Sequence, residues 1–250
     1  MSIMDLKNLM NIAINASKEA SNILVKNKNL DELDNSFNIK DVKLASDVNS
    51  EKILKKFIES KSKFPILGEE LGKSHDDLGE IFWVLDPLDG TFNYSRNIPI
   101  SCISIALVKN YEPILGVIYD FNNNDLYTGS ITQKAMLNDK NINVSDIDKI
   151  NQSVLLTGFP VKSDFSDQSL KNKIDDYQKY KKIRMIGSAA ISCVYVASGR
   201  AEVYKEEDTN LWDIAAGVII IRSAGGKADI KNLKDDFSLD IIASNKNLKI

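Results

Sequence analysis

One short segment constrains the fold more than any other part of the chain. It reads Trp83-Val84-Leu85-Asp86-Pro87-Leu88-Asp89-Gly90-Thr91. Proline fixes its own φ and lacks an amide hydrogen, so we expect an apolar strand to stop and turn at Pro87. A turn just past a strand end can aim the Asp86 and Asp89 carboxylates and the Leu88 carbonyl into one cleft. Oxygen atoms of these kinds are the ligands that hard divalent cations take.

Gly90 and Thr91 complete this segment with features that suit an anion. Glycine lets the backbone approach a ligand closely. If a helical turn begins here, the two amides can point at a bound phosphate. An ordinary strand-to-turn connection with capping acids would have the same sequence, so the segment alone leaves both interpretations open.

Three other acids stand at the ends of predicted elements. Glu69 ends an apolar run, Asp213 opens an apolar helix, and Asp47 precedes a helix. Each fits a helix cap or a solvated turn. Together with Asp86 and Asp89 they could instead converge on one divalent metal, which would offset the repulsion that raises carboxylate pKa values.

The rarest residues narrow the chemistry further. The 250 residues include a single histidine, His75, and two cysteines, Cys102 and Cys193. These residues cannot assemble the usual zinc sites within one chain. His75 lies in a polar run typical of a solvated loop, and the cysteines have the apolar neighbours of reduced core residues. An enzyme of this composition would rely on carboxylates, hydroxyls, backbone amides and a hard metal.

Charge and hydropathy restrict the partners and the location. The 32 basic and 35 acidic side chains give a net charge of −3, so no global basic field attracts nucleic acid or an anionic membrane. No run reaches the roughly 18 apolar residues of a membrane span, and the N-terminal segment lacks an uninterrupted apolar core. We therefore expect a cytoplasmic protein without membrane contact and without a direct nucleic-acid partner.

Apolar periodicity indicates the order of the elements. Helices are predicted over residues 6–25, 48–58, 168–180, 188–197 and 212–223, with Ser46 or Asp47 as N-cap of the second. Strands are predicted over residues 64–67, 81–85, 102–108, 114–119 and 125–127, and then over 153–157, 201–204, 227–230 and 241–243. The earlier strands indicate an antiparallel sheet. We predict an α+β half over residues 1–148 and an α/β half over residues 149–250, packed closely together.

A set of motifs runs through most of the chain. It comprises Gly68-Glu69-Glu70, Asp86-Pro87-Leu88-Asp89-Gly90-Thr91-Phe92-Asn93-Tyr94, Gly116 to Asp120, Thr157-Gly158-Phe159-Pro160, Arg184 to Ala190, Trp212 to Gly217, and Ala224-Gly225-Gly226. In this order and spacing the set resembles the inositol monophosphatase family, magnesium-dependent phosphatases of which many are lithium-sensitive. The resemblance implies a layered α-β-α-β-α sandwich of the sugar phosphatase type, with an antiparallel sheet in the N-terminal half and a mixed sheet in the C-terminal half.

The resemblance also implies a role for each site residue. The metal ligands would be Glu69, Asp86, Asp89, Asp213 and the Leu88 carbonyl, which together would hold two or three Mg²⁺ ions. Glu69 and Thr91 would orient the attacking water, and Asp47 would support Thr91 and help to hold a weaker metal. The substrate would contact Asp89, Gly90, Thr91, Gly187, Ser188, Ala189, Glu206 and Asp213. A homodimer is expected on the same grounds.

Two departures from the family pattern stand out. Leu44 takes the place of a threonine before Asp47, which weakens the role implied for Asp47. Ser223 replaces the usual glutamate before Ala224-Gly225-Gly226. Neither departure removes a metal ligand.

The residues after the Asp-Gly-Thr motif bear on the substrate. Relatives that act on bisphosphonucleotides carry lysine directly after this motif, whereas inositol and sugar phosphatases carry asparagine two places after it. Here Phe92 and Asn93 follow. The resemblance therefore implies a polyol or sugar phosphate, with inositol 1-phosphate first. Fructose 1,6-bisphosphate, alone or as part of a dual specificity, histidinol phosphate and a 3'(2'),5'-bisphosphonucleotide remain alternatives, as does a regulatory binding role in gene expression.

Overall fold

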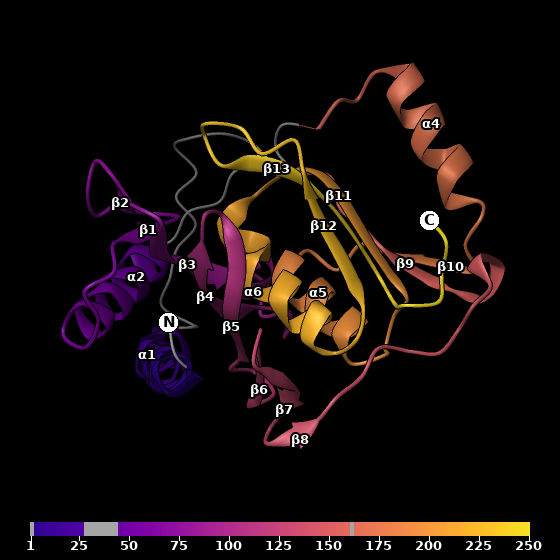
Figure 1. The fold of residues 1–250 in the computed structure, drawn as a ribbon. Coiled ribbons are helices and arrows are strands. Elements are labelled where there is room, and N and C mark those ends of the chain that lie inside the picture. The colour runs from indigo at the N-terminus through magenta and orange to yellow at the C-terminus, as the bar shows by residue number, and fades with distance from the viewer. Residues whose placement is uncertain (1–2, 28–44, 161–162) are drawn as a thin grey trace.

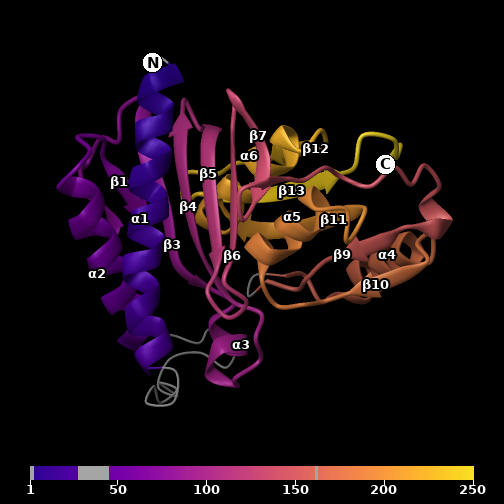
Figure 2. The same cartoon turned by 90° about the horizontal axis from the view of Figure 1, so that it is seen from below.

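The computed structural model describes residues 3–27, 45–160 and 163–250 of the chain, and they form five layers (Figure 1). Helices α1 (Ile3–Asn27) and α2 (Ala45–Glu59) cover one face of a large sheet. Helices α5 (Ala189–Ala197) and α6 (Leu211–Ser223) fill the space between that sheet and a smaller one. Helix α4 (Asp167–Tyr177) lies outermost (Figure 2). The predicted α-β-α-β-α sandwich is confirmed.

The large sheet holds the strands of the first half in the order β2-β1-β3-β4-β5-β6-β7-β8. Their bounds are Ile66–Gly68 (β1), Gly72–Lys73 (β2), Ile81–Asp89 (β3), Cys102–Lys109 (β4), Glu112–Asp120 (β5), Asp125–Ser130 (β6), Gln133–Leu137 (β7) and Lys140–Asn141 (β8). The predicted antiparallel pairing is present through most of this sheet, but β1 departs from it because it pairs in parallel with β3. Every other pairing in this sheet is antiparallel.

The predicted stop of the strand at Pro87 is wrong. Strand β3 continues to Asp89, and its register against β4 shifts between Asp86 and Asp89. Asp86 pairs with Ser104 and Asp89 with Cys102, so β3 has one residue more than β4 in this interval. A bulge of this kind accommodates a proline without an amide hydrogen, and it re-aims the side chains on either side.

A helical turn does begin after the bulge, as α3 (Thr91–Ser95). Gly90 precedes it with φ of 86°. A side chain there would be strained in that conformation, and its Cβ would lie 2.7 Å from the Ile100 carbonyl oxygen.

Helix α2 begins earlier than predicted. Ser46 and Asp47 lie inside its first turn, so neither is the N-cap. The altered position Leu44 lies outside the described residues.

The small sheet has the order β10-β9-β11-β13-β12. Its strands are Val154–Leu156 (β9), Lys182–Arg184 (β10), Val203–Asn210 (β11), Lys227–Lys231 (β12) and Ser238–Ser244 (β13), and a short 3-10 helix, η1 (Ile150–Gln152), precedes β9. Strand β9 pairs in parallel with β10 and β11, whereas β13 pairs antiparallel with β11 and β12. The predicted mixed sheet is confirmed. The division at residue 148 stays a prediction, because α6 packs on both sheets.

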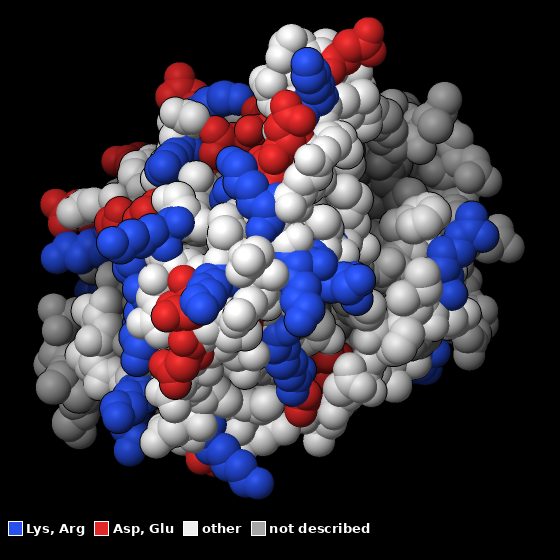
Figure 3. Space-filling model, turned by 90° about the vertical axis from the view of Figure 1, so that its right-hand side faces the viewer, with Lys and Arg blue, Asp and Glu red and all other residues white. Residues whose placement is uncertain are grey.

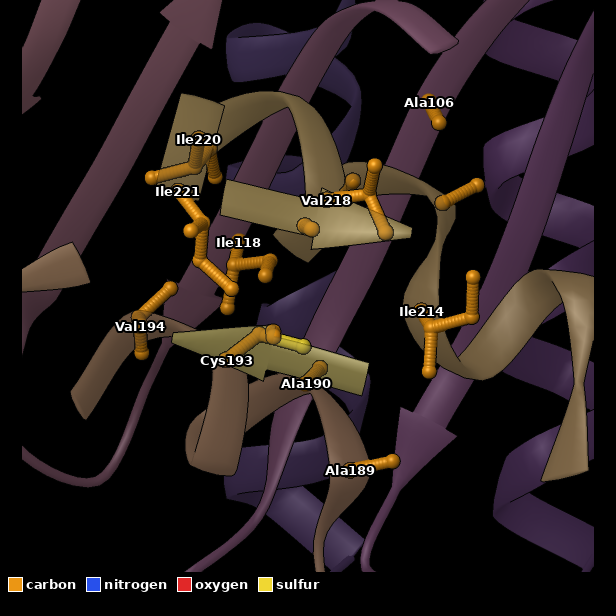
Figure 4. Close-up of a cluster of buried hydrophobic side chains, with 14 of the residues drawn as sticks. Ala106, Ile118, Ala189, Ala190, Cys193, Val194, Ile214, Val218, Ile220 and Ile221 are labelled. Atoms are coloured by element: carbon orange, nitrogen blue, oxygen red, sulfur yellow. The ribbon is translucent and has the colours of Figure 1, made fainter. Parts of the chain in front are cut away.

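Helix α6 of the central layer lies close to its neighbours at two glycines. Figure 4 shows side chains of α5, α6 and the large sheet in one apolar cluster, among them Cys193, Val218 and Ile118. A Cβ on Gly116 of β5 would overlap the Ala216 carbonyl oxygen of α6. A Cβ on Gly217 of α6 would overlap the side chain of Cys193. Helix α6 therefore approaches β5 at Gly116, and α5 at Gly217, more closely than a side chain at either glycine would allow.

The remaining sequence predictions concern single residues and membrane spans. Cys102 and Cys193 are buried free thiols and His75 is exposed, as predicted. Within the described ranges, no helix combines the length and the apolar character needed to cross a membrane.

Candidate active site

Glu69 follows β1, and helix α2 fixes the turn that carries it. The buried Glu51 carboxylate on α2 accepts hydrogen bonds from the amides of Glu70 at 2.7 Å and Leu71 at 2.9 Å. A side chain on Gly68 would overlap this carboxylate. Glycine at the end of β1 is therefore what allows α2 to reach the turn beside Glu69.

The same helix also contacts the bulge of β3. Ser50 Oγ, one position before Glu51, donates a hydrogen bond to the Pro87 carbonyl oxygen at 3.1 Å. Asp47 lies one turn earlier on α2 and is buried, and its negative charge contributes to raising the pKa of Glu69. Helix α2 thus holds two acidic segments of the large sheet at a fixed separation.

Asp89 lies at the end of the bulge and meets the first turn of α5. Its carboxylate accepts hydrogen bonds from the Ala190 amide at 2.7 Å, the Ala189 amide at 3.3 Å and the Ser188 hydroxyl. The positive end of a helix and its unpaired amides stabilise an anion in this position. The structure thus brings together Asp89 and the Gly187-Ser188-Ala189 turn that sequence reasoning placed at the substrate.

Asp213 lies in the first turn of α6. Its carboxylate accepts hydrogen bonds from the Thr209 hydroxyl at 2.8 Å and the Asn210 amide at 2.9 Å, as part of a capping box. Sequence reasoning allowed a capping role or a metal-binding role for this acid. The structure shows that it performs the cap while it also lines the cavity described next.

One cavity of about 460 Å³ joins these elements. It is lined by Glu69, Asp89, Thr157, Gly158, Phe159, Pro160, Gly187, Ser188, Ala189, Ser192, Glu206, Asp208, Thr209, Asn210, Trp212 and Asp213. The lining contains the predicted site residues Glu69, Asp89, Gly187, Ser188, Ala189, Glu206 and Asp213. It does not contain the predicted site residues Asp47, Asp86, Leu88, Gly90 or Thr91.

Burial and mutual repulsion raise the pKa of the acids around this cavity. Burial, and then the charge of Asp213, raises the pKa of Glu69 well above its ordinary value. Burial and the charges of Glu69 and Asp89 do the same to the pKa of Asp86. Burial, followed by the charge of Asp89, raises the pKa of Asp213 to about 7. These acidic side chains thus lie close to one another, and a bound cation would offset their mutual repulsion.

The donor set fits magnesium in its chemistry. Glu69, Asp86, Asp89 and Asp213 offer the carboxylate oxygens that Mg²⁺ takes in preference to nitrogen or sulfur. Within residues 3–27, 45–160 and 163–250, no three His, Cys, Asp or Glu side chains stand already arranged as a metal cluster. The acids converge on one region, and closing on an ion would require side-chain movement.

A hydrogen bond joins the Thr91 side chain to the Leu88 backbone. Thr91 Oγ1 donates to the Leu88 carbonyl oxygen at 2.9 Å. This bond uses the hydroxyl and the carbonyl to which the family resemblance assigns water orientation and metal binding. In this arrangement Thr91 Oγ1 keeps its acceptor lone pairs and can accept a hydrogen bond from a water, whereas donation to a water would require the hydroxyl to turn away from Leu88.

Glu206 illustrates a site residue that looks like surface in the sequence. It lies on β11, and its carboxylate accepts a hydrogen bond from the buried Tyr204 hydroxyl at 3.0 Å. Burial raises the pKa of Glu206 to about 8 despite this bond. Its position in the charged run 205–208 gave no sign of that environment, although alternation along a strand places its side chain on the opposite face from that of Lys205.

Sequence reasoning missed several residues of the site. Glu51 was not proposed, although it follows Asp47 by one helical turn and so shares its face of α2. Trp212 lines the cavity, and its indole Nε1 has no hydrogen-bond partner among the described residues. Neither Tyr204 nor Thr209 carries a sequence signal that would have separated it from the core.

Asn93 has a structural role that the family signature does not state. Its side-chain amide donates to the carbonyl oxygens of Ile100 at 2.9 Å, Ile186 at 2.7 Å and Gly187 at 3.2 Å. It lies outside the cavity lining. Asn93 therefore ties α3 to the turn before α5, and its link to substrate class would act through that turn.

These observations define a layered α/β protein with an acidic, oxygen-lined cavity between its two sheets. The model of the inositol monophosphatase family matches residues 5–246, and the chain belongs to this family.

Individual relatives carry different names. The Nus factor SuhB of Xylella fastidiosa (strain Temecula1) is 40% identical over 226 residues, which cover 88% of this chain and 81% of that protein. A fructose-1,6-bisphosphatase/inositol-1-monophosphatase of Aquifex aeolicus is 32% identical over 226 residues, which cover 90% and 83%. The solved structure of an inositol monophosphatase from Anabaena (Nostoc) sp. PCC 7120 has a TM-score of 0.84 and 32% identity, covering 97% of this chain and 92% of that one.

Proposed function

We propose that the protein is a magnesium-dependent phosphomonoesterase that hydrolyses a small polyol or sugar phosphate. The observation that supports this most is the convergence of Glu69, Asp89 and Asp213, from three distant parts of the chain, on one cavity. The family membership and the hard-oxygen donor set agree with it.

In this proposal each residue has a defined task. Glu69, Asp86, Asp89, Asp213 and the Leu88 carbonyl hold two or three Mg²⁺ ions. When bound, magnesium supplies neutralisation of the charge on the phosphoryl group and lowers the pKa of water. Glu69 and Thr91 orient the attacking water, Asp47 supports Thr91, and the Gly90 and Thr91 amides receive the phosphate. The turn at Gly187, Ser188 and Ala189, together with Glu206, binds substrate hydroxyls.

Inositol 1-phosphate is the first candidate substrate. Glu206 and the 187–189 turn line the cavity and offer several oxygen and amide groups to a ring with many hydroxyls. The Anabaena structure is that of an inositol monophosphatase, and the Aquifex relative is named for fructose 1,6-bisphosphate as well. Histidinol phosphate and a bisphosphonucleotide stay as alternatives.

A panel of phosphate esters incubated with the pure protein tests the function. We expect phosphate release with MgCl₂, none after addition of a chelator, and recovery when Mg²⁺ is restored. The fastest ester by kcat/KM identifies the substrate class. Absence of release from every ester at any Mg²⁺ concentration would contradict the proposal.

The second candidate is a regulatory binding role in gene expression. The relative of 40% identity is named a Nus factor, and that name favours this candidate. No direct contact with nucleic acid is proposed. Figure 3 shows the face of the molecule that bears α4, where basic and acidic side chains are interspersed instead of forming a field of one sign. An inactive ester panel would favour this candidate over catalysis.

Location, assembly and inhibitor sensitivity also belong to the proposal. We propose a cytoplasmic homodimer whose activity is sensitive to lithium. Light scattering of the pure protein would give the mass of the assembly for comparison with 27.9 kDa for one chain.

A further inference from the structure

A second and larger cavity opens beside the active site. It has a volume of about 730 Å³ and lies between α4 and the strands β11 to β13. Figures 1 and 2 show α4 standing at the edge of the molecule beside the small sheet. Thr157, Gly158 and Glu206 line both this α4 cavity and the active-site cavity. The two spaces are therefore adjacent and share a wall.

Helix α4 is attached to the sheet by polar contacts and by Tyr177, which packs against an apolar cluster of Leu155, Tyr180, Val203 and Leu248. None of its residues is buried. Lys173 forms an ion pair with Glu207, and Asp176 with Lys205 at 3.0 Å. Tyr177 adds a hydroxyl contact to Thr157 at 3.3 Å. These contacts place ionic and hydroxyl groups along the α4 side of the cavity, and that side suits a hydrated, hydroxyl-bearing ligand.

Glu206 stands at the boundary between the two cavities. A Cβ on Gly158 would lie 2.7 Å from Glu206 Oε2, so the absence of a side chain at Gly158 leaves room for the carboxylate. An ester whose phosphate lies near Asp89 and Asp213 would pass Glu206 where its alcohol extends toward α4. A carboxylate at this point accepts hydrogen bonds from hydroxyls or an ammonium group.

The charged residues that line the α4 cavity disfavour a second phosphate on the substrate. All three lysines that line it have an acidic neighbour: Lys173 pairs with Glu207, Lys205 pairs with Asp176, and Lys231 stands directly across the strands from Asp240. Asp164 and Glu206 add two further acids to the lining. An incoming phosphate would have to displace a carboxylate from a lysine, whereas a neutral or cationic group would not.

We propose that the α4 cavity receives the alcohol portion of the ester, and that it favours neutral polyhydroxylated or amine-bearing alcohols over those with a second phosphate. This inference rests on the proposed phosphatase function. It separates monophosphates of polyols and amino alcohols from fructose 1,6-bisphosphate and from bisphosphonucleotides as substrates.

Charge selectivity is tested with two esters that share a carbon skeleton, fructose 1-phosphate and fructose 1,6-bisphosphate. We expect kcat/KM to be at least about tenfold higher for the monophosphate, because like charges meet along the path. Glu207→Gln releases Lys173 from its pair and should shift this ratio toward the bisphosphate. Asp175→Asn is the matched control, since Asp175 is exposed on α4 outside the cavity lining and loses the same charge.

Occupancy is tested separately by filling the cavity. Ser169 lines it from α4, and Ser169→Phe should raise KM for inositol 1-phosphate while leaving ethyl phosphate, which is too short to reach α4, at its wild-type KM. A bisphosphate preferred by the wild type, or an unchanged ratio in Glu207→Gln with an unchanged KM in Ser169→Phe, would overturn the inference while hydrolysis itself continued. Failure to hydrolyse any ester would overturn the proposed function, and this inference with it.

Discussion

The Asp89 carboxylate accepts a hydrogen bond from the Ala190 amide at 2.7 Å, although 101 positions of sequence separate the two residues. Asp89 ends a strand of the large sheet, and Ala190 lies in the first turn of α5. The contact fixes the orientation of a candidate metal ligand through a helix that belongs to the other half of the chain. The candidate site therefore exists only when both halves are folded against each other.

Replacement of this acid is the most direct test of the site. Asp89→Asn keeps an acceptor for the Ala190 amide but removes the charge, so we expect kcat to fall by at least ~10²-fold. Asp229→Asn, on the exposed side of β12, should retain wild-type turnover. Phosphate release at saturating Mg²⁺ measures both variants, and near wild-type kcat in Asp89→Asn would show the assignment to be wrong.

Thr91 separates a structural from a chemical role. If its hydroxyl only bonds the Leu88 carbonyl, Thr91→Ala should lower stability by ~1 kcal/mol with little change in rate. If the hydroxyl orients water, the same variant should lose at least ~10²-fold in kcat at a nearly unchanged melting temperature. We expect the second result, with much of the activity retained in Thr91→Ser. Full activity per folded molecule in a destabilised Ala variant would refute the catalytic role.

Glu51 should influence magnesium binding without touching the ion. Glu51→Gln replaces one of the two acceptor oxygens with an NH₂ group, so the amide of Glu70 or of Leu71 loses its acceptor and the turn that carries Glu69 should shift. We expect Mg²⁺ affinity to fall by about tenfold or more, the usual effect of losing a partner that orients a ligand. Calorimetric titration with MgCl₂ measures this directly. Glu59→Gln, exposed at the end of α2, is the control, and equal affinities in the two variants would contradict the prediction.

Glu206 predicts a pH dependence of stability in the metal-free protein. Its pKa is about 8 when folded and near 4.5 when unfolded. At pH values between 4.5 and about 8, the Glu206 carboxyl keeps its proton in the folded chain and has lost it in the unfolded chain. The free energy of unfolding is therefore highest below pH 4.5 and falls as the pH rises toward 8. Glu206→Gln should reduce the fall of the melting temperature over this pH range, measured with chelator present. The exposed Glu80→Gln should leave the slope unchanged, and parallel slopes in all three proteins would refute the burial argument.

Lithium sensitivity rests on the family and on the acidic ligand set. We expect inhibition by LiCl at concentrations on the order of millimolar, where a small cation competes for oxygen ligands suited to Mg²⁺. A parallel titration with NaCl controls for ionic strength. Identical curves for the two salts would remove lithium sensitivity from the proposal.

Local patterns predicted most elements but not their contacts. The helix over residues 6–25 and the one over 212–223 have apolar residues at helical spacing, and both are present as α1 and α6. The prediction that the strand stops at Pro87 was wrong because a bulge accommodates a proline as well as a strand end does. Parallel pairing of β1 with β3 leaves no local signal, because both pairing modes use the same short apolar runs.

The site shows the same limit on a larger scale. Spacing placed Glu69, Asp89 and Asp213 at element ends, where side chains can face a cleft, and the three do line one cavity. Their convergence depends on how the layers stack, which no single segment encodes. The family resemblance supplied that information, and Glu51, which carries no motif of its own, was missed.

The glycines around α6 have a consequence for how this protein can change over generations. Because Gly116 and Gly217 leave no space beside α6, substitutions there would displace Asp213, and the acidic side of the cavity tolerates little variation. Helix α4 has no buried residue and can exchange side chains without disturbing that core. We therefore expect new substrate preferences to arise by mutation on α4, while the groups proposed for the chemistry stay fixed across descendants.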